Sequence, residues 1–197
     1  MKDPRHLVFV CVGNRNRSPF SEFFFSKLLS ERDKSLVNAI HVTSAGFVPQ
    51  IIKDKMAERH IGLPEPFFGR PLARTTRKAL HLLGIIVPET WKTKALSSEM
   101  VEEADMLITS LPDQKKDLVM LYPTAADRIF TIREVSQWEG YLLQEDPDYK
   151  EIPSDNTFWN YVEEDAPYVE RILSEVEKML TKAYPNILKH LGLEAAE

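Results

Sequence analysis

Residues 6–22 read HLVFVCVGNRNRSPFSE, and they combine an apolar run, a polar turn and a helical pattern. Its apolar run at 7–12 is rich in β-branched residues, which is typical of a strand buried on both faces of a parallel sheet. Ser18 can cap a helix, and Pro19 suits a first helical position. Apolar residues then recur at helical spacing, at Phe20, Phe23, Phe24 and Leu28. The stretch therefore predicts a strand, a tight turn that begins at Cys11, and a helix.

The rest of the chain continues this alternation of strands and helices. Further strands are predicted at 40–46, 105–110 and 127–132. Helices are predicted at 75–84, 97–104, 112–123 and 165–183. This order indicates an α/β fold in which right-handed crossovers cover both faces of an open parallel sheet. We therefore expect a single flavodoxin-like, doubly wound domain across residues 1–197, with four parallel strands.

Two segments, 48–70 and 136–165, fit this alternation poorly. We interpret both as insertions into the domain, because long irregular segments of compact domains are usually functional or mobile. The second segment is rich in aromatic residues, which either wall a substrate pocket or pack in the core. The segment contains Tyr149 and the five residues to which this choice applies, which are Trp138, Tyr141, Phe158, Trp159 and Tyr161.

The composition limits the class of protein. The 197 residues are 43% hydrophobic and 28% charged, which is enough for one substantial core. A net charge of −5 argues against a broad nucleic-acid surface. The sequence shows neither a secretory leader nor an apolar run near the roughly 20 residues of a membrane span, so we expect a cytoplasmic protein without a membrane partner. One cysteine excludes an intramolecular disulfide, and the five histidines lack zinc-ligand spacing, so neither metal nor cofactor is expected.

The turn after the first strand has the pattern of an anion site. Five residues separate Cys11 from Arg17, giving the spacing C-x5-R. Backbone N–H groups of such a loop point inward and the helix N-terminus adds positive potential, so a tetrahedral dianion binds without a metal. Arg17 adds a bidentate fork for two phosphate oxygens. The expected phosphate-binding residues are Val12, Gly13, Asn14, Arg15, Asn16, Arg17 and Ser18.

The same field acts on the sulfur of Cys11. It favours the thiolate, to which the Ser18 hydroxyl can donate a hydrogen bond. The alternative is that Cys11 is a buried small apolar residue, as an isolated cysteine in a strand usually is. The spacing to Arg17, together with Gly13, the Ser-Pro pair, the preceding strand and the following helix, favours a catalytic thiol.

The segment VCVGNRNRSPFSE resembles the signature of the low-molecular-weight protein tyrosine phosphatases. The resemblance extends to TSAG at 43–46, WKTKAL at 91–96, ADMLITS at 104–110 and the Asp-Pro pair at 146–147. It implies a four-stranded parallel sheet and a phosphocysteine mechanism.

The resemblance also implies roles for individual residues. Cys11 corresponds to the nucleophile, Arg17 to the phosphate clamp and Ser18 to the hydrogen-bond donor of the thiolate. Asn14 corresponds to the residue that organises the loop, and the resemblance implies a hydrogen bond from it to Ser44.

Three loop positions depart from the family's pattern. Many members have a second cysteine where this chain has Asn16, so Cys11 has no neighbouring cysteine for a disulfide. Arsenate reductases of the same fold need additional cysteines to relay electrons, and this chain has none. Arginine phosphatases of this fold tend to have threonine after the nucleophile, and Val12 has the same shape without the hydroxyl. Arg15 stands where an apolar residue is common, and it either deepens the anion field or points into solvent.

Two carboxylates compete for the role of general acid, which must protonate the leaving group and then activate water. The stretch QEDPDY resembles the family's acid loop with Asp146 in the catalytic position, although Asp148 stands where an aromatic residue is usual. Asp155 lies at a better distance from the last helix, but Asn156 replaces the proline. We favour Asp146 and keep Asp155 as the alternative acid.

The anion loop and the resemblance together imply a metal-independent phosphomonoesterase that dephosphorylates protein phosphotyrosine through a phosphocysteine intermediate. Its partners would be phosphorylated proteins or small aryl phosphates, with inorganic phosphate as product and inhibitor. Two alternatives remain open: a protein-arginine phosphatase of the same fold, and a catalytically weak phosphate-binding or regulatory module.

Overall fold

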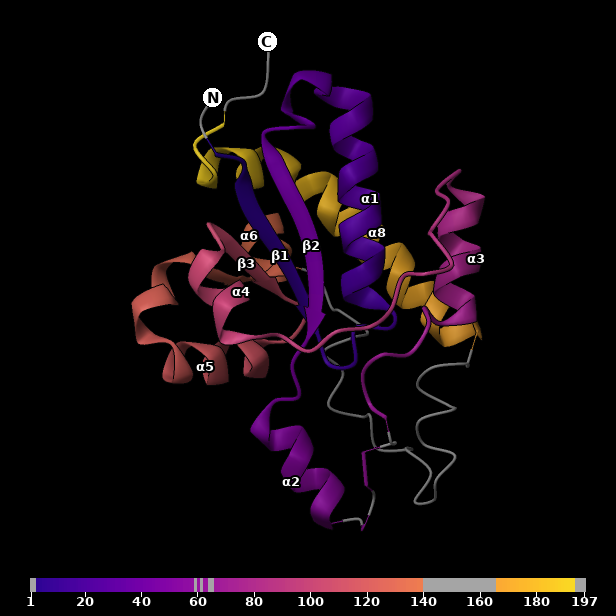
Figure 1. Ribbon diagram of the computed structural model, residues 1–197, viewed down its shortest axis with the longest axis vertical. Helices are drawn as coiled ribbons and strands as arrows, with labels where there is room; N and C mark the ends of the chain where they lie inside the picture. The colour runs from indigo at the N-terminus through magenta and orange to yellow at the C-terminus, as the bar shows by residue number, and fades with distance from the viewer. Residues whose placement is uncertain (1–2, 59, 61, 64–65, 140–165, 194–197) are drawn as a thin grey trace.

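The structure is a computed structural model, and it describes residues 3–58, 60, 62–63, 66–139 and 166–193. Its strands form one parallel sheet from β1 (Arg5–Cys11), β2 (Ile40–Gly46), β3 (Met106–Thr109) and β4 (Ile129–Thr131). The strand order is β2-β1-β3-β4, so β1 lies inside the sheet between β2 and β3 (Figure 1). The predicted four-stranded parallel sheet is confirmed.

Helices cover both faces of this sheet (Figure 1). Leu7 and Phe9 pack into one layer while Val8 and Val10 pack into the other, because successive side chains of a strand point to opposite faces. The first layer contains α1 (Arg17–Arg32), α3 (Arg74–Leu82), α6 (Ile132–Ser136) and α8 (Ala166–His190). The second contains α4 (Ser98–Glu103), α5 (Pro112–Leu121) and the 3-10 helix η2 (Pro123–Arg128). None of the described helices is long and apolar enough to cross a bilayer.

Two helix ends follow the predicted signals. Ser97 caps α4, because its hydroxyl accepts a hydrogen bond from the Met100 amide at 3.2 Å. Gly84 follows the end of α3 with a φ of 74°, the left-handed conformation in which glycine commonly ends a helix.

Helices α2 (Gln50–Glu58) and α8 differ from the prediction. Helix α2 forms inside the segment expected to be irregular, where only Met56 is buried and the apolar periodicity is therefore weak. It lies beyond the carboxyl ends of the strands (Figure 1). Helix α8 was expected to end near residue 183, but it continues through Pro185 to His190. Burial of Ile187 and Leu188 against the core favours this extension despite the proline.

The C-terminal end of α1 is fastened to α8. The Tyr184 hydroxyl donates a hydrogen bond to Asp33 Oδ2 at 2.6 Å, and the Arg32 guanidinium carbon lies 5.3 Å from the centroid of the tyrosine ring. Burial raises the pKa of Tyr184, and the hydrogen bond to Asp33 raises it further. The hydroxyl therefore keeps its proton as a donor, and both partners are buried.

Candidate active site

The predicted anion loop lies at the carboxyl edge of the sheet. Cys11 is the last residue of β1 and is buried. Neighbouring segments hold this end of the strand: the Phe47 amide donates to Cys11 O and the Ser110 amide to Val10 O, each at 2.8 Å. The loop then turns through Asn14, whose φ of 53° lies in the left-handed region that asparagine tolerates. The strand thus places the thiol at the start of the loop, where hydrogen bonds from the segments after β2 and β3 hold the backbone.

Ser18 does not cap α1, contrary to the prediction. The helix begins at Arg17, Asn16 occupies the N-cap position, and Pro19 is the third helical residue rather than the first. The buried Ser18 hydroxyl instead lies 3.0 Å from Cys11 Sγ as donor, with Ala45 O as a second acceptor at 3.2 Å. The expected hydrogen bond from Ser18 to the sulfur is therefore present.

The Asn14 side chain determines the direction of that hydrogen bond. The Lys94 backbone N–H donates to Asn14 Oδ1 at 2.9 Å, which fixes the orientation of the carboxamide because an amide N–H can only donate. Asn14 Nδ2 consequently donates to Ser18 Oγ at 3.0 Å and to Ser44 Oγ at 2.8 Å. Since Ser18 accepts from Asn14, its own hydrogen is available to its two acceptors, Cys11 Sγ and Ala45 O.

The segment that supplies the Lys94 amide is itself anchored beside β2. The Gly46 amide donates to Lys94 O and the Leu96 amide donates to Gly46 O, each at 2.8 Å. Gly46 and Ala95 form an isolated parallel bridge. Residues that resemble the family at 43–46 and 91–96 therefore meet at the loop, although the sequence did not indicate this pairing.

Glu22 is a functional candidate that the sequence reasoning missed. The Ser44 hydroxyl donates to Glu22 Oε2 at 2.5 Å. Burial raises the pKa of the Glu22 carboxyl, while hydrogen bonds from Ser44 and Trp91 and the charge of Lys94 oppose that rise. The available signal was spacing, because Glu22 follows Ser18 by four residues and so lies on the same face of the helix.

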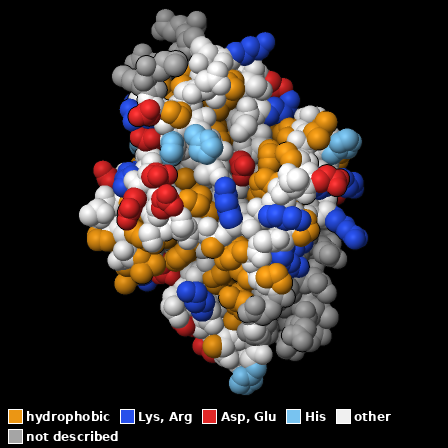
Figure 2. Space-filling view, in the orientation of Figure 1, with side chains coloured by type: hydrophobic (Ala, Val, Ile, Leu, Met, Phe, Trp, Pro, Cys, Tyr) orange, Lys and Arg blue, Asp and Glu red, His pale blue; other side chains and the backbone are white. Residues whose placement is uncertain are grey.

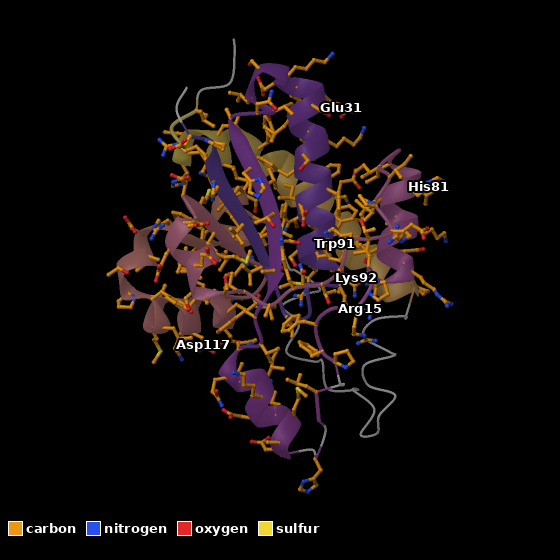
Figure 3. The ribbon with its side chains drawn as sticks, in the orientation of Figure 1. Arg15, Glu31, His81, Trp91, Lys92 and Asp117 are labelled. Carbon is orange, nitrogen blue, oxygen red and sulfur yellow. The ribbon has the colours of Figure 1, made fainter. Side chains whose placement is uncertain are left out.

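Positive charge gathers around the loop. Arg17 Nη1 is buried and has no hydrogen-bond partner within the described part of the chain. Arg15 is half-buried rather than fully solvated, and Lys92 is exposed. Figure 3 places Arg15 and Lys92 beside the N-terminal end of α1, and Figure 2 shows Lys and Arg side chains gathered across the same part of this face. The surroundings of the loop therefore favour an anion.

An aromatic pair packs over the loop and the end of β2. The rings of Phe67 and Phe68 lie 4.8 Å apart at 73°. A β-carbon at Gly13 would lie 3.6 Å from Phe67 Cζ, and one at Gly46 would lie 2.5 Å from Phe68 Cε1. Such a β-carbon would also lie 2.9 Å from the backbone oxygen of Val12, so glycine is required at position 46. The sequence analysis did not single out either phenylalanine.

The remaining predicted residues have different outcomes. Trp138 packs against the main core cluster, with Lys182 Nζ 5.9 Å from its ring, so core packing accounts for it. The other five aromatic residues of that segment lie outside the described residues, as do Asp146 and Asp155, and the choice of acid stays a prediction. Among the residues described, no three His, Cys, Asp or Glu side chains form a group that could hold a metal ion.

Comparison with known proteins places this site in a family. The family model for low molecular weight phosphotyrosine protein phosphatase matches residues 6–192. The parallel sheet and the cysteine-bearing loop at its carboxyl edge agree with this match. The chain belongs to the low molecular weight phosphotyrosine protein phosphatase family.

Individual relatives show how far the similarity extends. Low molecular weight protein-tyrosine phosphatase A of Mycobacterium bovis is 50% identical over 46 residues, which are 23% of this chain and 27% of that protein. The match thus spans about a quarter of the curated relative's length. A protein-arginine-phosphatase of Bacillus subtilis is 26% identical over 129 residues, 65% of this chain and 70% of that protein.

A solved structure supports the fold. The YwlE arginine phosphatase from Geobacillus stearothermophilus superposes with a TM-score of 0.62 and 18% sequence identity, covering 98% of this chain and 100% of that one. At this identity the similarity establishes the architecture alone.

Proposed function

We propose that this protein is a metal-independent phosphomonoesterase that acts on phosphotyrosine in proteins. The observation that carries the proposal is Arg17 Nη1, which is buried without a partner among the described residues, at the end of the loop that begins at Cys11. A buried guanidinium nitrogen without an acceptor is costly, and a phosphate oxygen would satisfy it. Membership of the family supports the same activity.

In the proposed reaction, Cys11 Sγ attacks phosphorus, and the sulfur–phosphorus bond forms as the bond to the leaving oxygen breaks. The Ser18 hydroxyl, ordered by Asn14, stabilises the negative charge on sulfur. Arg17 and the backbone N–H groups of residues 12–17 hold the three peripheral oxygens. Water then attacks the phosphocysteine, which releases inorganic phosphate and restores the thiolate.

We assign proton transfer to Asp146, with Asp155 as the alternative. The carboxylic acid gives its proton to the leaving oxygen, and the resulting carboxylate then takes a proton from the attacking water. The support for this assignment is the sequence pattern alone.

The preference for an aryl ester is supported by Phe67. Its ring packs close to Gly13 of the loop, and an aromatic side chain there can contact the ring of a phenolic leaving group. We also propose a cytoplasmic location, since a single nucleophilic thiol without a protecting second cysteine needs a reducing compartment.

Two other functions compete with this one. A phosphoarginine substrate is supported by the similarity to a protein-arginine-phosphatase over 129 residues. A phosphate-binding module is supported by the unusual context of both candidate acids.

Parallel assays with a phosphotyrosine peptide, a phosphoarginine peptide and p-nitrophenyl phosphate distinguish the three functions, with Cys11→Ser as the matched control. We expect turnover of both aryl esters, its loss in Cys11→Ser, and no effect of a metal chelator. Faster hydrolysis of the phosphoarginine peptide would assign the second function. Phosphate binding without turnover of any substrate would assign the third.

A further inference from the structure

The N-terminus of α1 lacks a conventional cap although it begins with a residue that often provides one. Asn16 occupies the N-cap position, where an asparagine side chain commonly accepts a hydrogen bond from a first-turn amide. Within the described residues 3–58, the Asn16 side chain makes no such bond. Its φ of −123° and ψ of −81° also lie outside the extended region that capping residues usually adopt.

The Asn16 carboxamide is instead held by a different helix. Thr76 Oγ1, on α3, donates a hydrogen bond to Asn16 Oδ1 at 2.6 Å. Thr76 is completely buried. The start of α3 is fixed beside the loop, because the Ala73 amide donates to Arg15 O at 3.4 Å and the buried Leu80 packs in the core. Helix α3 therefore holds the Thr76 hydroxyl next to the Asn16 side chain.

The alternative place for the carboxamide is the site that phosphate needs. The first-turn amides of a helix have no acceptor inside the helix. Pro19 lacks an N–H, so a capping Asn16 would have to use the Ser18 amide at the second helical position. A carboxamide oxygen there would compete with an oxyanion for the electropositive end of α1.

We propose that Thr76 is a positioning residue that holds the Asn16 carboxamide away from the N-terminus of α1 and so keeps this helix end open for phosphate. The inference rests on the proposed function, because it takes the loop after Cys11 to be the phosphate site. It adds a residue outside the loop, sixty positions along the chain from Asn16, to the determinants of phosphate affinity.

The first test is Thr76→Val, which removes the hydroxyl and keeps the shape. We expect the dissociation constant of inorganic phosphate, measured by calorimetry, and the KM for p-nitrophenyl phosphate each to rise about fivefold. The reason is that the Asn16 carboxamide, released from Thr76, would cap α1 in most of the protein molecules. The value of kcat should not change, because saturating substrate displaces the carboxamide. Thr76→Ser should restore both constants. Thr75→Val, the same change at the preceding buried position of α3, is the matched control and should leave them unchanged.

The second test repeats Thr76→Val in an Asn16→Ala background. Without a carboxamide to compete, the threonine change should have no further effect on phosphate affinity. If phosphate affinity falls as much in this background, or if kcat falls with affinity in Thr76→Val, Thr76 acts through packing and the inference is wrong. Equal phosphate affinity in wild type and Thr76→Val also overturns it while leaving the proposed function intact. A wild-type protein that binds no phosphate would instead refute the proposed function.

Discussion

The two ends of α1 use buried polar groups in opposite ways. At the C-terminal end, the Tyr184 hydroxyl and the Asp33 carboxylate satisfy each other at 2.6 Å, under the Arg32 guanidinium. At the N-terminal end, the Ser18 hydroxyl lies 3.0 Å from the Cys11 sulfur, and Arg17 Nη1 has no partner in the described part of the chain. The C-terminal end completes its hydrogen bonds within the fold, whereas the N-terminal end retains a guanidinium nitrogen that no described residue accepts from.

This difference separates a stabilising site from a reactive one on a single helix. A satisfied buried pair contributes to the free energy of unfolding, whereas an unsatisfied buried donor lowers it. Substitutions at the C-terminal end should therefore change stability and leave activity intact. Substitutions at the N-terminal end should do the reverse.

The largest expected effect is that of Arg17→Lys. Lysine keeps the charge but loses the planar fork, so kcat/KM should fall by about a thousandfold, the upper range for removing one aligned donor. The free energy of unfolding should change little, because Nη1 makes no hydrogen bond to the described residues that the substitution could break. Steady-state kinetics and urea denaturation of the same preparations test this. A marked loss of stability with intact turnover would reverse the comparison between the two ends.

The next effect concerns the acid that completes the N-terminal site. Asp146→Asn should lower kcat by about a hundredfold, the usual scale for a general acid, while Asp155→Asn should be nearly silent. The defect should grow from p-nitrophenyl phosphate to phosphotyrosine, because the poorer leaving group depends more on protonation. Measuring kcat for both variants on both esters tests the assignment. If Asp155→Asn loses kcat instead, Asp155 is the acid. If neither variant changes kcat, the phosphate-binding module is favoured.

At the C-terminal end, Tyr184→Phe should lower the free energy of unfolding by about 1–2 kcal/mol, because the buried Asp33 loses its donor. Turnover should be unchanged. Tyr122→Phe is the matched control, since the Tyr122 hydroxyl lies 3.4 Å from an exposed Ser98 hydroxyl and should contribute little. Equal losses in the two variants would show that the ring, and not the buried hydrogen bond, fastens α1 to α8.

The smallest effect is a pH dependence at Glu22. Burial raises the pKa of this carboxyl in the folded protein above its usual value of 4.5, so folding favours the protonated form. Its stabilising contribution is complete below pH 4.5 and is lost as the pH rises through the folded-state pKa. Relative to wild type, Glu22→Gln should therefore gain stability as the pH rises from 4.5 to neutrality. Urea denaturation across that range measures the change.

Glu31→Gln is the control for removal of a negative charge from an exposed position of the same helix. A difference between wild type and Glu22→Gln that stays flat or falls with rising pH would contradict the assignment of Glu22 as a buried acid.

Local patterns were sufficient for the strand, the loop and the helix around Cys11. The apolar run and the spacing to Arg17 require only neighbouring residues, and the resemblance supplied the hydrogen bond from Asn14 to Ser44. The helix start was predicted wrongly because Ser18 has two local uses, as a cap or as a donor. A sulfur at 3.0 Å determines the outcome, and the sequence alone does not reveal that competing partner.

The rest of the site depends on contacts between distant segments. The Lys94 amide orients Asn14 across 80 positions, and Thr76 reaches Asn16 across 60. Phe68 comes close enough to Gly46 to exclude a side chain there. These contacts follow from the path of the segments after β2 and α3, which no periodicity in the sequence specifies.

Helix α8 has a consequence for the synthesis of the protein. It contributes a large share of the main core cluster and packs against α1, α3 and α6, yet every strand of the sheet leaves the ribosome before it does. Until it emerges, Phe25 and the neighbouring apolar face of α1 lack their covering layer, and a nascent chain in that state offers a surface for chaperones or for aggregation. The face of α1 that α8 covers would thus be complete only after α8 has emerged.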